Sequence, residues 1–304
     1  MAREGPISGS EASGVFQREL GRVSVVDFNA SFRGEIYGEG GVDADWFAEH
    51  VGRHGIDLAR SPRWIVDGAL GGMALLAFRG ERAWIGAFGV VPGLRGRGFA
   101  RRFVADALAV AAESGATSVE LEVLERNPAA IALYERCGFS PTGKLVVWKR
   151  APFAASEAVL ADDIIGGRTR DGDGARACDG DHARDYDVAA VARIARRPAT
   201  CWQREPLSVA AAAPFAAILI GPAGAPDGYA FVRHAGGRTA VLDAGARDAQ
   251  AAAAVLAALD ASAPAAEPML INEPPHGALH DALAAHPAWS ELTRQRRMIV
   301  RLRP

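Results

Sequence analysis

The chain has 304 residues, of which 49% are hydrophobic and 23% charged, and its mean hydropathy is +0.03. This composition is typical of a folded globular protein, and at about 150 residues per domain the length indicates two domains. A formal net charge of −2 excludes a global field that would recruit nucleic acid or an acidic membrane surface. Because no apolar run approaches the ~18 residues of a membrane span, we expect a cytoplasmic protein without nucleic-acid or membrane partners.

The cysteine content argues against a disulfide framework and against a metal site. Cys137, Cys178 and Cys201 are widely spaced and odd in number. Disulfide-rich domains and zinc sites instead show even, closely spaced sets. We therefore expect three reduced thiols and no bound metal.

The first half of the sequence predicts a helical pair, three antiparallel strands and a strand–helix alternation. Residues 1–14 are expected to form a frayed arm, and 15–150 a first domain. Apolar residues at helical spacing predict helices at Val25–Tyr37 and Asp43–His54, with Asp43 as the N-cap of the second. The elements that follow are predicted strands at Arg63–Asp67, Gly71–Phe78 and Ala83–Val90, a helix at Ala100–Ser114, a strand at Ser118–Leu124, a helix at Ala129–Cys137 and a strand at Val146–Trp148.

The second half repeats this order of elements. Residues 151–187 are rich in Asp, Gly and Arg and are expected to be a linker with one short strand at most, and 188–304 a second domain. Its predicted elements are a helix at Val188–Arg196, strands at Phe215–Ile220, Gly228–Arg233 and Thr239–Asp243, a helix at Ala249–Leu259, a strand at Met269–Asn272, a helix at Ala278–His286 and a strand at Met298–Leu302. Leu270 and Leu283 each follow their counterparts, Leu121 and Tyr134, by 149 positions, which indicates an internal duplication.

A glycine- and arginine-rich loop joins the strand that ends at Val90 to the long helix after it. Gly96 and Gly98 let the backbone approach a ligand closely, and Ala100 is small enough not to block it. Unpaired N–H groups and the positive end of the helix dipole meet at such a junction, and Arg95 and Arg97 add charge. The loop therefore predicts a phosphate site.

Two motifs together resemble the GNAT superfamily of N-acetyltransferases. They read Val90-x-Pro92-x-x-Arg95-Gly96-x-Gly98-x-Ala100 and, beyond a helix, Leu121-Glu122-Val123-(x)3-Asn127-(x)2-Ala130-(x)2-Leu133-Tyr134-(x)3-Gly138-Phe139. The resemblance covers residues 15 to 150 and is most similar to the branch that contains ribosomal-protein alanine acetyltransferases. It implies two tandem domains of α/β (α+β) class, each a mixed, mostly antiparallel twisted sheet flanked by helices.

The resemblance also implies acetyl-CoA as co-substrate and a set of residues that hold it. Phe88, Gly89 and Val90 would offer main-chain groups to the pantetheine arm and the acetyl carbonyl where the fourth and fifth strands splay apart. Asn127 would hydrogen-bond the pantetheine arm. The N–H groups of six consecutive residues would cradle the pyrophosphate: Gly96, Arg97, Gly98, Phe99, Ala100 and Arg101.

Transfer to an amine needs a group that takes a proton from the amine and one that gives a proton to the departing thiolate. By the resemblance, Glu122 is the base, acting through water, and Tyr134 is the acid. Glu120, two positions earlier on the same strand face, is the rival base, and the fourth strand, Ala83–Val90, has no acid or histidine. Cys137 has no histidine near it in sequence, so we expect direct attack in a ternary complex rather than an acyl-enzyme.

The acceptor is expected to be an amine-bearing small molecule, a peptide or a protein N-terminus. The first two helices usually wall its pocket in this fold, and either Asp27 or Asp57 would suit a cationic amine. The other candidates for the lining are aromatic, and most of them would equally serve the core: Phe28, Phe32, Tyr37, Trp46 and Trp84.

The second half lacks the phosphate loop. It reads Asp243-Ala244-Gly245-Ala246-Arg247-Asp248 there, and Ile271 and Leu283 stand at the places of Glu122 and Tyr134. We therefore expect a degenerate domain with a packing, acceptor-shaping or dimerising role, so a homodimer stays open. The alternative function is a non-catalytic acyl-CoA-sensing module whose second domain recruits a partner.

Overall fold

The fold is described from a computed structural model that covers residues 15–33, 40–150, 176–178, 201–222, 226–235, 238–262 and 268–302. The expected arm, the helix predicted at 188–196 and nearly all of the expected linker lie outside these residues. One short strand, β7 (Arg176–Cys178), falls within the linker. Across the described ranges, no helix combines the length and the apolar character needed to cross a membrane.

The chain divides into two compact units that do not follow the sequence halves. Unit 1 takes in Met1–Leu121, Asn127–Pro141 and Met298–Pro304, and unit 2 takes in Glu122–Arg126 and Thr142–Arg297. Strands β5 (Ser118–Leu124), β6 (Ser140–Arg150) and β12 (Trp289–Arg301) therefore each contribute residues to both units. The domain ranges 15–150 and 188–304 stay predictions.

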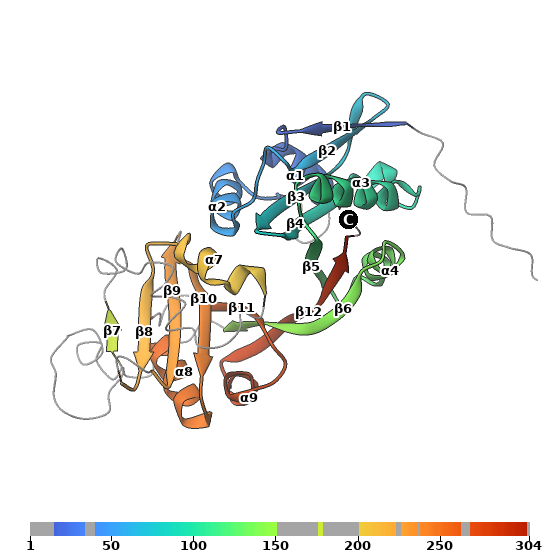
Figure 1. Ribbon diagram of the computed structural model, residues 1–304. Coiled ribbons are helices and arrows are strands. Elements are labelled where there is room, and N and C mark those ends of the chain that lie inside the picture. Colours follow the sequence, from blue (N-terminus) through green and yellow to red (C-terminus); the bar gives the residue numbers. More distant parts are fainter. Residues whose placement is uncertain are drawn as a thin grey trace, which may run out of the picture. The chain divides into compact units, whose positions relative to one another are not determined.

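Unit 1 is built on strands in the order β1-β2-β3-β4-β5. They comprise β1 (Phe16–Leu20), β2 (Pro62–Val66), β3 (Ala69–Arg79), β4 (Arg82–Val90) and the start of β5. The first four are antiparallel, whereas β4 and β5 are parallel. The helices are α1 (Val25–Phe32), α2 (Ala44–His54), α3 (Phe99–Glu113) and α4 (Pro128–Arg136), with a short 3-10 turn η1 (Pro92–Leu94) before α3 (Figure 1).

Helices α1 and α3 cover opposite faces of this sheet. A Cβ on Gly72 would meet the Phe103 ring of α3, whereas a Cβ on Gly89 would meet Ser31 of α1. Gly72 and Gly89 occupy adjacent positions of the β3–β4 register, where side chains point to opposite faces. Met73 to Ala77 are consequently fully buried, which explains why the sequence of β3 is a continuous apolar run rather than an alternating one.

The predicted elements of the first half agree closely with the observed ones. Strand β5 has the predicted bounds, and Asp43 caps α2 by accepting a hydrogen bond from the Trp46 N–H at 2.7 Å. Helix α1 ends at Phe32, earlier than predicted, and 34–39 lie outside the described residues. Strand β1 was not predicted, because its five residues carry too few apolar positions to show a period.

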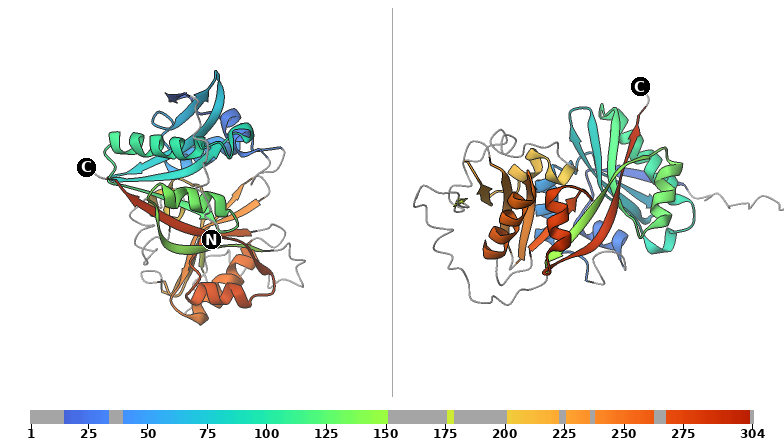
Figure 2. Two further views of the ribbon diagram at one scale, coloured as in Figure 1. Left: turned by 90° about the vertical axis from the view of Figure 1, so that its right-hand side faces the viewer. Right: turned by 90° about the horizontal axis from the view of Figure 1, so that it is seen from below.

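Unit 2 continues the strand order as β5-β12-β6-β11-β10-β9-β8-β7. Its other elements are η3 (Trp202–Arg204), α7 (Pro206–Ala210), β8 (Ala216–Ile220), β9 (Gly228–Ala235), β10 (Arg238–Ala246), α8 (Ala249–Ser262), β11 (Pro268–Glu273) and α9 (Ala278–Ala285). Figure 2 shows α8 lying across strands β8 to β10. The predicted fold class, a mixed and mostly antiparallel sheet flanked by helices, is thus confirmed.

The last strands of the two sequence halves exchange places. β6 pairs antiparallel with β11, with Leu270 opposite Trp148, and β12 lies between β5 and β6. β12 is also much longer than the strand predicted at Met298–Leu302. The prediction was too short because most residues of β12 before Met298 are polar and show no apolar pattern. Main-chain pairing on both edges, rather than burial, holds that polar part in a strand.

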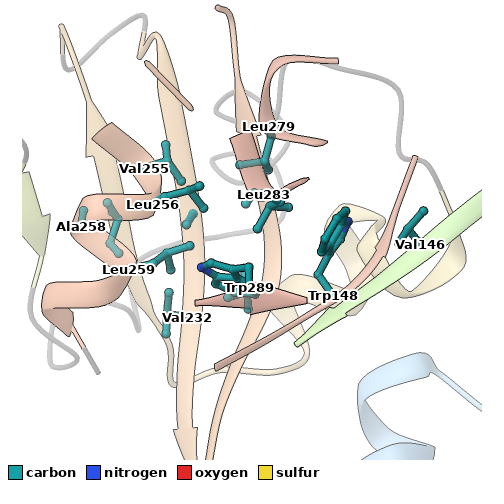
Figure 3. Close-up of a cluster of buried hydrophobic side chains, with 14 residues drawn as sticks. Val146, Trp148, Val232, Val255, Leu256, Ala258, Leu259, Leu279, Leu283 and Trp289 are labelled. Atoms are coloured by element: carbon teal, nitrogen blue, oxygen red, sulfur yellow. The ribbon is translucent and has the colours of Figure 1, made fainter. Parts of the chain in front are cut away.

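A buried apolar cluster joins α8 and α9 to the unit 2 sheet. Figure 3 shows Trp289 of β12 and Trp148 of β6 packed among leucines of the two helices. The helical members drawn there are Val255, Leu256, Ala258 and Leu259 of α8 and Leu279 and Leu283 of α9. Leu283, the counterpart of Tyr134, is fully buried in this cluster and is a core residue.

On the other face of unit 2, a buried arginine ties three elements together. Arg204 of η3 donates from Nε to Asp243 Oδ1 at 2.6 Å and from Nη2 to the Ala244 carbonyl oxygen at 2.5 Å. Its third nitrogen, Nη1, donates to Glu273 Oε2 of β11. Asp243 also accepts from the Tyr229 hydroxyl at 3.0 Å, so the charges are surrounded by partners. Burial lowers the pKa of Arg204, but Asp243 and Glu273 outweigh it and raise the pKa overall, so the arginine stays charged.

Replacing this arginine should destabilise the protein strongly. Arg204→Met would leave Asp243 and Glu273 buried without their cation, and breaking such a pair costs about 3–5 kcal/mol of unfolding free energy. The measurement is the urea midpoint of the variant against the parent. The matched control is Arg247→Met, since Arg247 is 68% exposed and pairs with Asp227 and Asp248 on the surface. Equal midpoints for the two variants would contradict the role given to the cluster.

Candidate functional site

The parallel pairing of β4 and β5 stops shortly after it begins. Their paired positions are Arg82–Ser118, Ala83–Val119 and Trp84–Glu120, although β4 runs on to Val90. The register between β3 and β4 shifts between Ile85 and Ala87, so Gly86 is the extra residue of a β-bulge. A bulge bends its strand and increases its twist, and we attribute the separation of β4 from β5 to it.

The bulge leaves one edge of β4 available to a ligand. From Ile85 to Val90 the strand pairs with β3 on one side, and on the other side the described residues supply no ladder partner. Phe88, Gly89 and Val90 lie on this stretch, as the splay predicted from the sequence requires. Gly89 has to lack a side chain, because a Cβ there would lie 2.7 Å from Ser31 Cβ. Unpaired N–H and C=O groups at this edge can bind an extended, amide-containing ligand.

The N-terminus of α3 has the features of an anion site. Gly96 and Gly98 have φ of 73° and 82°, and Gly98 is the N-cap of α3. No side chain among the described residues caps the helix, and no acid lies in its first turn. By contrast, α1 and α2 are capped by Ser24 and Asp43. The first N–H groups of α3 therefore have no side-chain cap among the described residues, and no acid of the first turn offsets the helix dipole, which favours an anion.

The two arginines of the loop have different roles in the structure. Arg95 donates from Nε to the Val90 carbonyl oxygen at 2.9 Å and from Nη2 to the Ser31 carbonyl oxygen at 3.1 Å. Its guanidinium thus holds the loop against the end of β4 and of α1. Arg97 is exposed, with Nη1 3.5 Å from the Gly93 carbonyl oxygen. Arg97 is therefore better placed than Arg95 to reach a ligand, a distinction that the sequence did not make.

The other predicted loop residues contribute mainly their backbone. Phe99 is 1% exposed and packs at 5.7 Å from Phe103, so its side chain belongs to the core. Ala100 is half-buried and Arg101 is exposed in the first turn of α3. Their N–H groups belong to the uncapped set at the helix start, as predicted.

Tyr134 lies against the separated part of β4. Its ring is 6.3 Å from Phe88 and 5.6 Å from Phe139, centroid to centroid, and the residue is 7% exposed. Burial, and next the nearby Cys137, raise the pKa of Tyr134 well above its usual value. Its hydroxyl has no hydrogen-bond partner in the described part of the chain. A protonated hydroxyl in this position is available to donate to a ligand.

Asn127 has a structural role at the start of α4. It is the N-cap residue, and its Oδ1 accepts from the Ala130 N–H at 3.0 Å. The amide nitrogen is not consumed by this contact, so the predicted hydrogen bond to a ligand would come from Nδ2. That ligand role stays a prediction.

The two glutamates of β5 differ in their partners. Glu120 forms an ion pair with Arg82 at 3.3 Å, at the last position where β4 and β5 pair. Glu122 is half-buried, and its Oε2 accepts a hydrogen bond from Gln203 Nε2 at 3.3 Å within unit 2. The choice between Glu122 and Glu120 as the base stays a prediction.

Cys137 is unsuited to nucleophilic attack. It is half-buried, and burial raises the pKa of its thiol, with Arg101 and Arg136 acting in the opposite direction. The thiolate is the reactive form, so a raised pKa reduces its reactivity. Direct attack in a ternary complex stays a prediction.

The two acids considered for a cationic acceptor are both engaged. Asp27 closes the capping box of α1 with Ser24 and pairs with Arg63 at 3.2 Å. Asp57 accepts from Arg60 Nε at 2.6 Å. Phe28, Phe32 and Trp46 form a ring cluster with Phe28 at its centre, as core residues do, and Tyr37 lies outside the described residues.

The sequence did not predict a site at two histidines of α2, His50 and His54, which lie in a row of rings that reaches Trp84. Trp46, His50 and His54 recur every fourth residue along α2, with neighbouring rings 4.9 Å and 4.8 Å apart, and His54 lies 5.6 Å from Trp84. Burial and then Arg53 lower the pKa of His50 to about 4, so it is neutral at physiological pH. The i, i+4 spacing was the signal that could have identified this face of α2. No group of three metal-binding side chains occurs in the ranges that the structure covers.

Unit 2 contains a second strand pair of the same design, and there the opening is filled. β10 and β11 pair in parallel at Thr239–Pro268, Ala240–Met269 and Val241–Leu270, and the β9–β10 register shifts between Val241 and Asp243. Beyond this point Arg204 bridges Asp243 of β10 and Glu273 of β11. The arginine cluster thus occupies the place that is open between β4 and β5.

The helix after β10 is also closed to anions. Asp248 precedes α8, and its Oδ1 accepts from the Ala251 N–H at 2.9 Å. That hydrogen bond, and next the one from Arg247, hold the pKa of Asp248 below its usual value. An ionised N-cap satisfies the helix start and repels phosphate. The geometry of this half agrees with its expected degeneracy.

Comparison with known proteins extends this description. Residues 24–139 match the model of the acetyltransferase (GNAT) family. No curated protein matches the sequence. A GCN5-related N-acetyltransferase from Sphaerobacter thermophilus is similar in structure, with 16% identity, 86% of this chain and 87% of that chain covered, and a TM-score of 0.61.

Two further solved structures cover almost the whole chain. A putative acetyltransferase from Pyrococcus horikoshii has 12% identity over 100% of this chain and 93% of that chain, with a TM-score of 0.59. A tandem GNAT protein from the clavulanic acid biosynthesis pathway has 15% identity over 96% and 99%, with a TM-score of 0.58. The segment 24–139 is therefore related in sequence to the GNAT acetyltransferases, and the chain has the fold of solved GNAT proteins.

Proposed function

We propose that the chain is an N-acetyltransferase that moves an acetyl group from acetyl-CoA to a primary amine. One observation carries the proposal: the open edge of β4 leads directly, through the loop at Arg95–Gly98, to the uncapped start of α3. An extended amide chain ending in a pyrophosphate needs an edge of this kind followed by an anion site. The family match of residues 24–139 supports the same reaction.

The residues present fit acetyl-CoA. The N–H groups of Gly96 through Arg101 would hold the pyrophosphate, with charge from Arg97. Phe88, Gly89 and Val90 would hold the pantetheine arm and the acetyl carbonyl through their main chain, and Asn127 would add its side-chain amide. Acetyl-CoA, when bound, supplies an acetyl group activated as a thioester.

The chain's own groups complete the proton balance. Glu122 takes the proton that the attacking amine must lose, through a water, as the carbon–nitrogen bond forms and the carbon–sulfur bond breaks. Tyr134 gives its proton to the departing sulfur, for which its raised pKa keeps it supplied at neutral pH. The acceptor is an amine on a small molecule, a peptide or a protein N-terminus. The closer likeness to ribosomal-protein alanine acetyltransferases stays a prediction.

The phosphate site can be tested by replacing one glycine with two side chains that have the same shape but differ in charge. Gly98 has a positive φ that asparagine and aspartate tolerate best among side chains, so Gly98→Asn and Gly98→Asp suffer similar backbone strain. The aspartate alone places a negative charge at the start of α3. We expect the acetyl-CoA Kd of Gly98→Asp to exceed that of Gly98→Asn by at least about tenfold in calorimetry. Equal affinities would remove the pyrophosphate from this helix end.

The acid role can be tested by removing one oxygen. Tyr134→Phe keeps the ring that packs against Phe88 and Phe139, so acetyl-CoA affinity should hold. Without the proton donor, kcat should fall by about 10²- to 10⁴-fold. The measurement is thiol release from acetyl-CoA in the presence of the best acceptor from a panel of amines. An undiminished kcat would exclude Tyr134 as the acid.

A further inference from the structure

The hydroxyl of Ser31, in the last turn of α1, is not explained by the folding of the helix. The residue is 1% exposed, and its Oγ has no hydrogen-bond partner in the described part of the chain. A serine within a helix can donate to the carbonyl oxygen four residues earlier, here that of Asp27, but Ser31 does not. A buried hydroxyl without a partner disfavours folding, so an alanine would suit the packing at this position better.

Ser31 lies directly against the open stretch of β4. A Cβ on Gly89 would come within 2.7 Å of the Ser31 Cβ, so helix and strand are in contact there. The Ser31 carbonyl oxygen accepts from Arg95 Nη2 at 3.1 Å, and Arg95 also donates to the Val90 carbonyl oxygen. The backbone of Ser31 is therefore held beside the main-chain groups that are proposed to bind the thioester. All four residues belong to unit 1.

Ser31 and Tyr134 lie on opposite faces of this strand. The Phe88 ring points to the α3 face, since it is 5.9 Å from Trp64, and the Trp64 ring stacks at 4.5 Å on Phe103 of α3. Tyr134 packs on the same Phe88 ring. The next residue along β4 is the glycine that faces Ser31 of α1. A ligand along the edge of β4 thus has the tyrosine on one face and the serine on the other.

The two faces suit the two halves of an acyl transfer. The amine has to approach the thioester carbon with its lone pair aimed at that carbon, and holding one of its N–H groups fixes this direction. The oxygen of a serine hydroxyl accepts such a hydrogen bond. Because Tyr134 occupies the α3 face, the α1 face is the side from which the amine can approach.

We propose that Ser31 binds the acceptor: its Oγ accepts an N–H of the attacking primary amine on the α1 face of β4. The inference rests on the proposed function and adds to it the place where the amine is held. Rotation about the single χ1 bond turns Oγ to the open edge while the contact with Arg95 holds the backbone. A hydroxyl has no charge, so the group bound is a neutral amine. Asp27 and Asp57, the acids considered for a cationic amine, are both engaged by arginines.

The experiment uses the full-length chain with Ser31→Ala, which removes the hydroxyl and keeps the contact of α1 with β4. The matched control is Ser118→Ala. Ser118 is also 1% exposed, and its Oγ also has no hydrogen-bond partner among the described residues, but it pairs with Arg82 at the other end of β4. We expect kcat/KM for the best amine of a panel to fall about tenfold in Ser31→Ala and to stay unchanged in Ser118→Ala. Neither variant should have a weaker acetyl-CoA affinity in calorimetry or a lower urea midpoint than the parent.

The failure of this inference can be told apart from the failure of the proposed function. An unchanged kcat/KM for Ser31→Ala, beside an impaired Tyr134→Phe, removes Ser31 from acceptor binding and leaves the proposed function intact. A lower urea midpoint for Ser31→Ala alone overturns the inference in favour of a structural role, and a weaker acetyl-CoA affinity overturns it in favour of a role in cofactor binding. If the parent chain releases no thiol with any amine of the panel, the proposed function fails, and the role of Ser31 fails with it.

Discussion

The bulge at Gly86 is the constraint on which the candidate site depends. It ends the parallel pairing of β4 with β5 after Trp84 and Glu120, and thereby exposes main-chain groups that a regular sheet would consume. The bulge requires a glycine, because a Cβ at position 86 would lie 2.4 Å from the Trp84 ring. The same stretch of β4 carries Phe88, against which Tyr134 packs, and leads into the loop before α3.

The second half of the sequence shows what happens when this opening is not used. It keeps the parallel pair, the register shift and the helix that follows, but Arg204 bridges the separated strands and Asp248 caps the helix. Buried ion pairs are weak sources of stability compared with apolar packing. Their presence at this point is explained by geometry: the separation of β10 and β11 leaves unpaired polar groups that need partners, and a single guanidinium supplies several.

Local sequence patterns predicted most helices and strands well. They did not predict which strands pair when those strands lie far apart in the sequence. The apolar alternation of Ser118–Leu124, the Asp43 cap and the glycines of the loop are recorded in neighbouring residues, and each matched the structure. The exchange of β6 and β12 could not be foreseen, since both are final strands with similar apolar ends. For the same reason, the sequence around Asp27 does not reveal its ion pair with Arg63, which lies 36 residues further along the chain, whereas Arg60 stands only three residues after Asp57.

For the candidate site, too, the sequence predicted features that lie within one segment but not contacts between distant segments. Residue types and spacing were enough to nominate Tyr134 and the loop, because those roles depend on one segment each. The division of labour between Arg95 and Arg97, and the contact between Gln203 and Glu122, depend on residues brought together by folding. The roles of all these residues toward a ligand remain proposals.

The central claim is that one strand opening in this chain is available to CoA while the other is filled. Calorimetric titration of the full-length chain with acetyl-CoA measures this directly, through the number of molecules bound. The account predicts one molecule per chain. Two molecules per chain, or none, would contradict it.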